Sequence, residues 1–120
     1  MMARRVARAG DVYWIDPNPV AGREMQGHHR FVVITPKEIN ALGLAMTVPV
    51  TSGGQFARST GLTVPIQGHD TQGVAVCNQV RTFDLEAREK AGTARHVETL
   101  DATTTAEIIA RVVSILDPEN

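Results

Sequence analysis

The apolar residues of this chain come in short runs with clusters of Gly, Pro, Asn, Asp and Ser between them. Such runs are typical of β-strands, and strands that follow one another at short intervals favour a small barrel over βαβ units. We therefore expect strands at residues 11–16, 31–35, 44–50 and 62–66, one or two more within 74–83, and a last one near 93–98. Pro49 is tolerable in its strand only near an edge or a bulge. A length of 120 residues suits one domain.

Two helices interrupt this β-rich pattern. Thr35, Pro36 and Glu38 have the spacing of a capping box with proline at the first helical position, which predicts a short helix that ends near Leu42. Near the end of the chain, apolar residues recur at helical spacing, and they are Ile108, Ile109, Val112, Ile115 and Leu116. Either Thr104 or Asp101 caps this last helix. The fold class we expect is therefore β-rich α+β.

Charge and composition exclude several classes of protein. The net charge is −1, with eight Arg/Lys against five Asp/Glu in residues 1–83 and four against eight in residues 84–120. With a sequence pI near 6.4, any nucleic-acid contact must be a local patch. No apolar run approaches the roughly 20 residues of a membrane span, and the basic start has no apolar stretch behind it, so we expect no signal peptide. The single Cys77 should be a small buried hydrophobe, which suits the cytoplasm.

Reactive side chains concentrate between the first two expected strands. The segment 22–30 carries one carboxylate, two imidazoles and two guanidiniums. A loop held at both ends by buried strands is positioned by the scaffold and open to water, so it is a good place for function. These groups are the ones that phosphodiester cleavage needs without a metal. His28 and His29 have no third ligand at a suitable spacing, so we expect neither a metal nor another cofactor.

Four motifs in order give the chain a family resemblance. They are Gly10-Asp11-Val12-Tyr13-Trp14 with Asp16-Pro17, the loop Gly22-x-Glu24-x-x-Gly27 that ends at Arg30, Val48-Pro49-Val50-Thr51-Ser52-Gly53-Gly54 with Phe56-Ala57-Arg58, and Asn78-Gln79-Val80-Arg81. Together they resemble the MazF/PemK toxins, the endoribonuclease halves of bacterial toxin–antitoxin pairs. The likeness runs from about residue 9 to residue 116. We expect residues 10–117 to form the toxin domain and residues 1–9 a basic flexible tail.

The resemblance implies a fold and a function. The fold would be a small SH3-like barrel of the CcdB/Kid/MazF type, used as a homodimer. The activity would be metal-independent, sequence-selective cleavage of single-stranded RNA, with mRNA as the substrate. Internal attack by a ribose 2′-OH would leave a 2′,3′-cyclic phosphate and a 5′-OH. A cognate antitoxin with an acidic, poorly ordered tail would restrain the enzyme.

The resemblance also assigns roles to individual residues. Glu24 aligns with the loop carboxylate of the family and is the expected base, because it can accept the proton of the 2′-OH. Arg30 aligns with the catalytic arginine; since a guanidinium holds its proton, we assign it the phosphate and the transition-state charge. Thr51 supplies a hydroxyl at the end of a central strand. The expected RNA contacts are His28, Ser52, Phe56, Arg58, Asn78, Gln79 and Arg81.

Some residues depart from the family pattern, and they leave alternatives open. The PemK branch has an Arg and an Asp where this chain has Val76 and Asn78, and these two take part in its proposed acid–base pair. An Asn side chain cannot accept the proton, so that version of the mechanism does not apply here. One alternative is a non-enzymatic CcdB-like toxin that binds gyrase. Another is a decayed member that binds RNA or an antitoxin without cleaving RNA.

Overall fold

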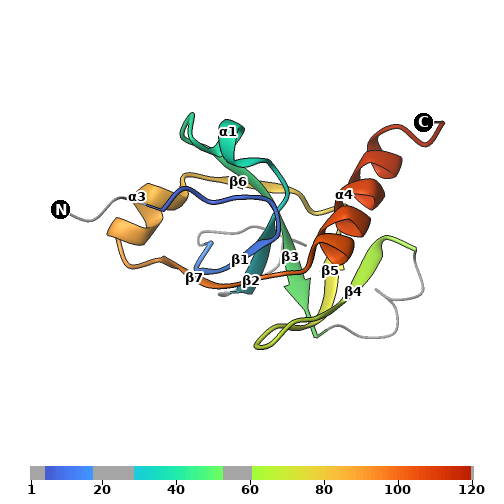
Figure 1. Ribbon diagram of the computed structural model, residues 1–120, viewed down its shortest axis with the longest axis horizontal. Helices are drawn as coiled ribbons and strands as arrows, with labels where there is room; N and C mark the ends of the chain where they lie inside the picture. The colour runs from blue at the N-terminus through green and yellow to red at the C-terminus, as the bar shows by residue number, and fades with distance from the viewer. Residues whose placement is uncertain (1–4, 18–28, 53–60, 120) are drawn as a thin grey trace.

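The computed structural model describes residues 5–17, 29–52 and 61–119, and it is drawn in Figure 1. In these residues seven strands combine with three helices, among them a short internal helix and a long helix near the end of the chain. The strands are β1 (Asp11–Ile15), β2 (His29–Val33), β3 (Ala45–Thr51), β4 (Thr63–Gln67), β5 (Gln72–Val76), β6 (Arg81–Phe83) and β7 (Ala94–Thr99). The helices are α1 (Lys37–Asn40), α3 (Leu85–Lys90) and α4 (Ala102–Leu116). All the strands expected from the sequence are confirmed, and the 74–83 segment divides between two of them.

The strands form one antiparallel sheet in the order β4-β5-β3-β2-β1-β7. The long strand β3 changes partner along its length: its start pairs with β6 through residues 45–47, and its end pairs with β5 through Val50 and Thr51. Pro49 lies at this change of partner: it stands opposite Phe31 of β2, and neither β5 nor β6 pairs with it on the other side of β3. The sequence predicts that this proline lies near an edge or a bulge, and the structure places it at a gap in the pairing on one side of β3.

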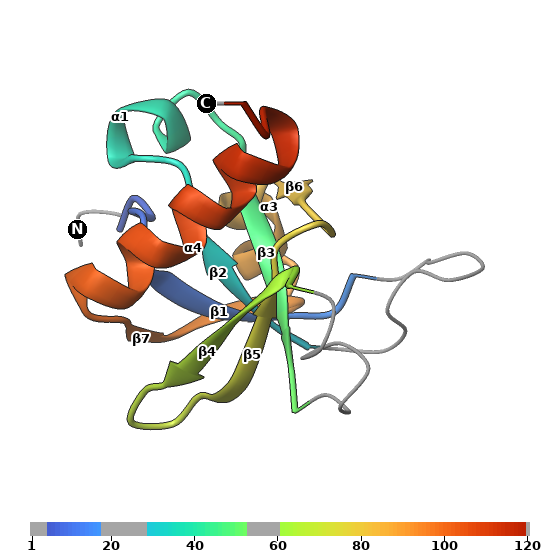
Figure 2. The ribbon, with the colours of Figure 1, turned by 90° about the vertical axis from the view of Figure 1, so that its right-hand side faces the viewer.

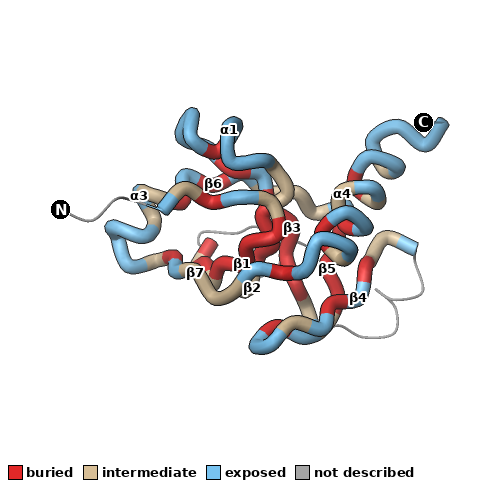
Figure 3. Tube along the Cα trace, in the orientation of Figure 1, coloured by how far each residue is buried: buried red, intermediate tan, exposed pale blue. Residues whose placement is uncertain are grey.

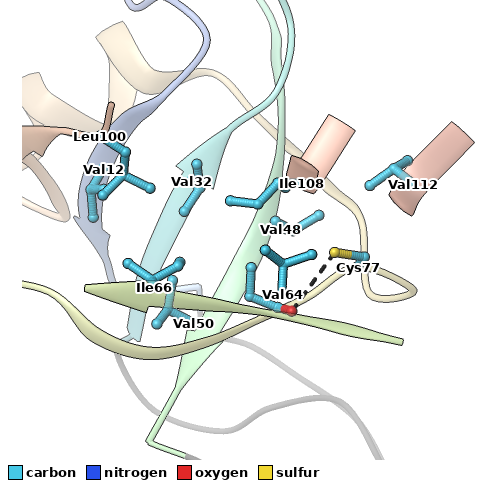
Figure 4. Close-up of a cluster of buried hydrophobic side chains, with 11 residues drawn as sticks. Val12, Val32, Val48, Val50, Val64, Ile66, Cys77, Leu100, Ile108 and Val112 are labelled. Atoms are coloured by element: carbon cyan, nitrogen blue, oxygen red, sulfur yellow. Dashed lines mark hydrogen bonds between the residues drawn. The ribbon is translucent and has the colours of Figure 1, made fainter. Parts of the chain in front are cut away.

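The sheet buries both of its faces. One face, which we call the α4 face, presents Val12, Val32, Val48 and Val50 to Ile108 and Val112 of α4 and to β4 (Figure 4). The other, the α3 face, buries Tyr13, Ile15, Phe31, Val33 and Phe83 with Leu85 of α3. Figure 3 shows the buried stretch through the centre of the sheet, with exposed helix surfaces outside it. Because successive strand residues point to opposite faces, the face of each site residue follows from its register.

The single cysteine behaves as expected. Cys77 is 1% exposed and packs in the cluster under α4. Its thiol lies 3.7 Å from the carbonyl oxygen of Ala75. Burial raises its pKa to about 11, because the thiolate would lose its hydration. A thiol with that pKa is a structural hydrophobe and a poor nucleophile.

The helix boundaries differ in part from expectation. The capping box at Thr35 is wrong: Pro36 is the N-cap residue and no side chain caps α1. The Thr35 hydroxyl instead donates to Oδ1 of Asn40, 2.5 Å away, and accepts from the amide of Met46. This hydroxyl joins α1 to β3, a tertiary use that a local motif cannot reveal.

The sequence offers two candidates, Thr104 and Asp101, for the N-cap of the last helix. Asp101 is the N-cap, since its carboxylate accepts a hydrogen bond from the amide of Thr104 at 3.0 Å. The helix α3 was not expected from the sequence. It is capped by Asp84, whose side chain accepts from the amide of Ala87. Six residues are too few for the apolar periodicity that identifies longer helices.

The segment before β1 packs against the domain from Arg5 onward. Ala7 is buried with the α3-face cluster, and its carbonyl accepts from Nδ2 of Asn40 at 2.8 Å. Asp11 is fully buried at the start of β1. Its carboxylate accepts from Nη2 of Arg5 at 2.8 Å, from the amide of Arg8 at 3.0 Å and from the hydroxyl of Thr99 at 2.6 Å. One buried carboxylate thus joins this segment to β1 and β7.

Candidate functional site

The candidate site residues fall into two groups. Glu24, His28, Phe56 and Arg58 lie outside the described residues, so their roles stay predictions. Arg30, Thr51, Ser52, Asn78, Gln79 and Arg81 are described. The residues of the first group belong to the segments that follow β1 and β3 in the sequence. Arg30 is near the start of β2, directly after the first segment, and Thr51 is at the end of β3, directly before the second.

Arg30 is the second residue of β2, at the end of the sheet where β1 stops. It stands opposite Trp14 on β1 and Val50 on β3. Alternation along β2 places its side chain with Val32 on the α4 face, just beyond the buried valines. Its Nη1 donates to the backbone carbonyl of Asp70, in the turn between β4 and β5. The guanidinium of this half-buried residue is therefore held in place at the rim of the core.

Thr51 ends β3 at the same end of the sheet, opposite Val74 of β5. The neighbouring Gly73 has a φ of 133°, and a Cβ there would lie 2.2 Å from the carbonyl oxygen of Thr51. Only glycine allows this close approach of the two backbones. The exposed Ser52 follows directly. Alternation places the Thr51 side chain on the α3 face, on the opposite side of the sheet from Arg30.

The remaining described residues lie further along β3. Asn78 and Gln79 are in the turn between β5 and β6, where Asn78 is exposed. Arg81 pairs with Thr47, and its guanidinium carbon is 5.1 Å from the centre of the Phe83 ring. Arg81 therefore shares the α3 face with Thr51, four residues away along β3. Within one chain the sheet separates Arg30 from Thr51 and Arg81.

A second arginine that sequence reasoning missed lies two strands away from Arg30, on the other side of Trp14. Trp14 pairs with Arg30 on one side and with Arg95 of β7 on the other. The guanidinium carbon of Arg95 is 5.6 Å from the Trp14 ring centre, within cation–π range. Trp14 is only partly buried. The three residues form a cationic row across β2, β1 and β7 that only the strand register reveals.

The turn between β4 and β5, the loop that joins these two strands in Figures 1 and 2, contacts Arg30 of β2 and Glu98 of β7. Glu98 of β7 holds it: one carboxylate oxygen accepts from the amide of His69 at 2.8 Å and the other from the amide of Asp70 at 2.9 Å. Burial raises the pKa of Glu98, but hydrogen bonds from residues 69–71 outweigh it and lower the pKa below its usual value. The sheet order begins with β4 and ends with β7. In the described residues no strand pairing joins these two strands, and the contact of Glu98 with the turn connects them.

The strand end that leads into residues 18–28 is also fixed. Nη1 of Arg88 on α3 donates to the carbonyl of Asp16 at 2.8 Å, and the amide of Asp16 donates to the carbonyl of Thr93 at 2.9 Å. The guanidinium of Arg88 also lies 4.7 Å from the Phe83 ring centre. Helix α3 thus holds the start of the segment that contains Glu24.

Two searches of the described ranges bear on the classes of function. They contain no group of three His, Cys, Asp or Glu side chains placed to hold a metal ion. They also contain no helix long and apolar enough to cross a membrane.

Residues 8–116 match the family described as PemK-like, MazF-like toxin of type II toxin-antitoxin system. The chain belongs to this family. The endoribonuclease PemK of Escherichia coli is 36% identical over 124 aligned positions, which cover 96% of this chain and 90% of that protein. The endoribonuclease toxin ChpB of E. coli K12 is 37% identical over 91 positions, which cover 73% of this chain and 78% of that protein.

Solved structures of PemK/MazF toxins confirm the expected barrel-type fold. The crystal structure of MazF from Deinococcus radiodurans has a TM-score of 0.79 at 27% identity, covering 94% of this chain and 98% of that one. A MazE–MazF complex from the same organism has a TM-score of 0.74 and covers 95% and 98% of the two chains. At 23% identity the second likeness shows the fold alone.

Proposed function

We propose that this chain is a metal-independent endoribonuclease toxin that cleaves single-stranded RNA, with mRNA as its substrate. The observation that carries the proposal is the PemK/MazF match over residues 8–116, together with relatives that are themselves endoribonucleases. The position of Arg30 supports it. Its guanidinium is anchored at the rim of the sheet, beside Trp14 and Arg95, where a phosphate could approach from solvent.

The chemistry follows from the side chains available. Glu24 accepts the proton of the ribose 2′-OH, which then attacks the adjacent phosphorus. Arg30 offers fixed N–H donors to the charge that builds up on the phosphorane, and fixed donors need no reorganisation at the moment of reaction. Because Thr51 lies on the opposite face of the sheet from Arg30, its hydroxyl donates to this phosphate from a second copy of the chain. As the phosphorus–oxygen bond breaks, the 5′-oxygen takes a proton from solvent water, and protonated Glu24 returns its proton to solvent. The products are a 2′,3′-cyclic phosphate and a 5′-OH.

We propose that the toxin acts as a homodimer, because one sheet holds Arg30 and Thr51 on opposite faces and a second copy can complement either face. Large exposed apolar side chains support this: they are Ile39, Leu42, Leu44, Met46, Val113 and Leu116. Surfaces of this kind commonly belong to protein interfaces. Burial of several of them in a dimer would remove apolar area from water.

A cognate antitoxin with an acidic, disordered tail is the second partner that we propose. Solved complexes of MazE with MazF support an antitoxin partner for proteins of this fold. The cationic row of Arg30 and Arg95 beside Trp14 suits an acidic peptide, because carboxylates and phosphates both accept hydrogen bonds from guanidinium N–H groups. Given an mRNA substrate and a free buried Cys77, we place the protein in the cytoplasm.

Incubation with a long single-stranded RNA in excess EDTA tests the proposed function. We expect discrete cuts whose upstream fragments end in a 2′,3′-cyclic phosphate and whose downstream fragments begin with a 5′-OH. The ends are identified by phosphatase and kinase treatment before sequencing. The Glu24→Gln variant, which keeps the size of the side chain and removes its basicity, should lose the cuts.

Two other outcomes would contradict the proposal. If the folded protein binds RNA with a steep salt dependence and never cuts it, the chain is a binding-only member of the family. If it leaves RNA intact and captures DNA gyrase in parallel with its toxicity, it acts like CcdB. Cleavage that disappears in EDTA would show that the chemistry needs a metal.

A further inference from the structure

We propose that Glu98 is a positioning residue for cleavage: it fixes the turn between β4 and β5, and the turn fixes the guanidinium of Arg30. The inference rests on the proposed function, because it gives Arg30 a role in RNA cleavage. It connects β7, at one end of the sheet order, to the candidate site on β2.

The first step is the contact between Glu98 and the turn. Its two carboxylate oxygens accept from two successive amides, those of His69 and Asp70. A carboxylate that accepts two amide hydrogen bonds is strongly oriented, since charge-assisted bonds are the stronger kind. The lowered pKa of Glu98 agrees with this arrangement, because hydrogen bonding favours its charged form.

The second step is the stiffness of the turn. The amide of Gly68 donates to the carbonyl of Thr71 at 2.8 Å, which closes a tight turn. A Cβ on Gly68 would lie 2.4 Å from Oε1 of Glu98, so the backbone passes directly against the carboxylate. Thr71 is fully buried, and Ile66 on the preceding strand is in the core under α4. The residues on both sides of the turn, Ile66 before it and Thr71 after it, are therefore buried.

The third step leads to Arg30. Asp70 is bonded through both of its backbone groups: its N–H donates to Glu98, and its carbonyl accepts from Nη1 of Arg30. With one N–H held by the protein, the planar guanidinium has a defined direction for its remaining donors. A planar fork loses less freedom on binding phosphate when it is already oriented. Glu98 is thus connected to Arg30 through the backbone of one residue, Asp70.

The test compares Glu98→Gln with Glu107→Gln, an exposed glutamate on α4 that serves as the matched control. A glutamine at 98 accepts one amide bond, but its own NH₂ faces the second amide. We expect kcat for RNA cleavage to fall by about tenfold to a hundredfold, because small misplacements of a catalytic group cost that much. KM should change by less than about twofold, since the cationic surface is intact. The control should match the wild type.

A merely structural role for Glu98 is distinguished by two further measurements. In the Arg30→Ala background, Glu98→Gln should lower the residual single-turnover rate no further, because residues that act as a unit are not additive. In NMR spectra of the wild type, the Arg30 side-chain N–H signals, assigned by their absence in Arg30→Lys, should be sharp and protected from exchange. In Glu98→Gln they should exchange faster, while the backbone signals of α4 stay unchanged.

The outcomes separate the inference from the proposed function. If the wild type never cuts RNA, the proposed function fails, and the NMR comparison still tests the link from Glu98 to Arg30. If the wild type cuts and Arg30→Ala does not, but Glu98→Gln cuts like the wild type with unchanged Arg30 signals, the inference is overturned and the function stands. Equal additional loss in the Arg30→Ala background would also overturn it.

Discussion

Replacement of Arg30 by alanine should lower the rate of RNA cleavage by about a thousandfold while the protein stays folded. The guanidinium supplies charge and oriented N–H donors to the phosphorane, and removal of such groups typically costs about 10²- to 10⁵-fold in rate. The loss should fall on kcat and kcat/KM alike, because the interaction is strongest in the transition state. Single-turnover cleavage in EDTA measures it, and circular dichroism confirms the fold.

Arg8→Ala is the matched control for this prediction. Arg8 is exposed, and its contact with Asp11 runs through its backbone amide, which the substitution retains. The control should cleave RNA at the rate of the wild type. A folded Arg30→Ala protein that cleaves as fast as this control would show that the site is misassigned.

Replacement of Asp11 by alanine should lower the free energy of unfolding by about 2–4 kcal/mol. The carboxylate is fully buried, and its removal leaves the amide of Arg8 and the hydroxyl of Thr99 without their acceptor. Both hydrogen bonds are partly buried, and a buried donor left unpaired costs about 1–3 kcal/mol, which is the upper range for each of them. For a chain of this size the loss corresponds to a melting temperature lower by roughly 10 °C. Urea unfolding at neutral pH measures it, with the exposed Asp117→Ala as control.

The same carboxylate predicts a pH dependence. Burial raises the pKa of Asp11, but bonds from Thr99, the amide of Arg8 and the side chain of Arg5 outweigh it and lower the pKa in the folded state. Its stabilisation is therefore complete above the pKa of an unfolded aspartate, about 3.9, and is lost as the pH falls through the lower folded value. Glu98 and Asp101 shift in the same direction, so only the comparison with Asp11→Asn isolates Asp11.

The outcome expected is a convergence at acid pH. The wild type should be more stable than Asp11→Asn at pH 7, and the difference should shrink between about pH 4 and pH 2. A stability difference that stays constant down to pH 2 would mean that the charge of Asp11 does not matter and only its shape does.

Much of the fold could be predicted from the sequence, for reasons visible in particular elements. The strands β1 and β2 contain the short apolar runs 12–15 and 31–33, and α4 has an apolar stripe long enough to show its period. The short α3 and the use of the Thr35 hydroxyl could not be predicted in this way. Both depend on contacts with residues distant in sequence, and local patterns contain no information about such contacts.

The residues of the candidate site could likewise be predicted from the sequence only where they lie in a motif. The resemblance selects Glu24, Arg30 and Thr51 because they lie in contiguous motifs. Glu98 and Arg95 belong to no motif. Arg95 lies beside Trp14 because β7 pairs with β1, and Glu98 is connected to Arg30 through the backbone of Asp70. Alternation along β2 and β3 also separates Arg30 from Thr51, which a linear motif cannot show.

A single modified RNA tests the central claim of metal-free attack by the 2′-OH most directly. Once a cut site is mapped, two otherwise identical oligonucleotides are compared in EDTA, one with ribose and one with 2′-deoxyribose at the nucleotide 5′ to the cut. We predict that the ribose oligonucleotide is cleaved to a 2′,3′-cyclic phosphate and that the deoxy one binds equally well and stays intact. Cleavage of the deoxy bond at the same rate would contradict the mechanism.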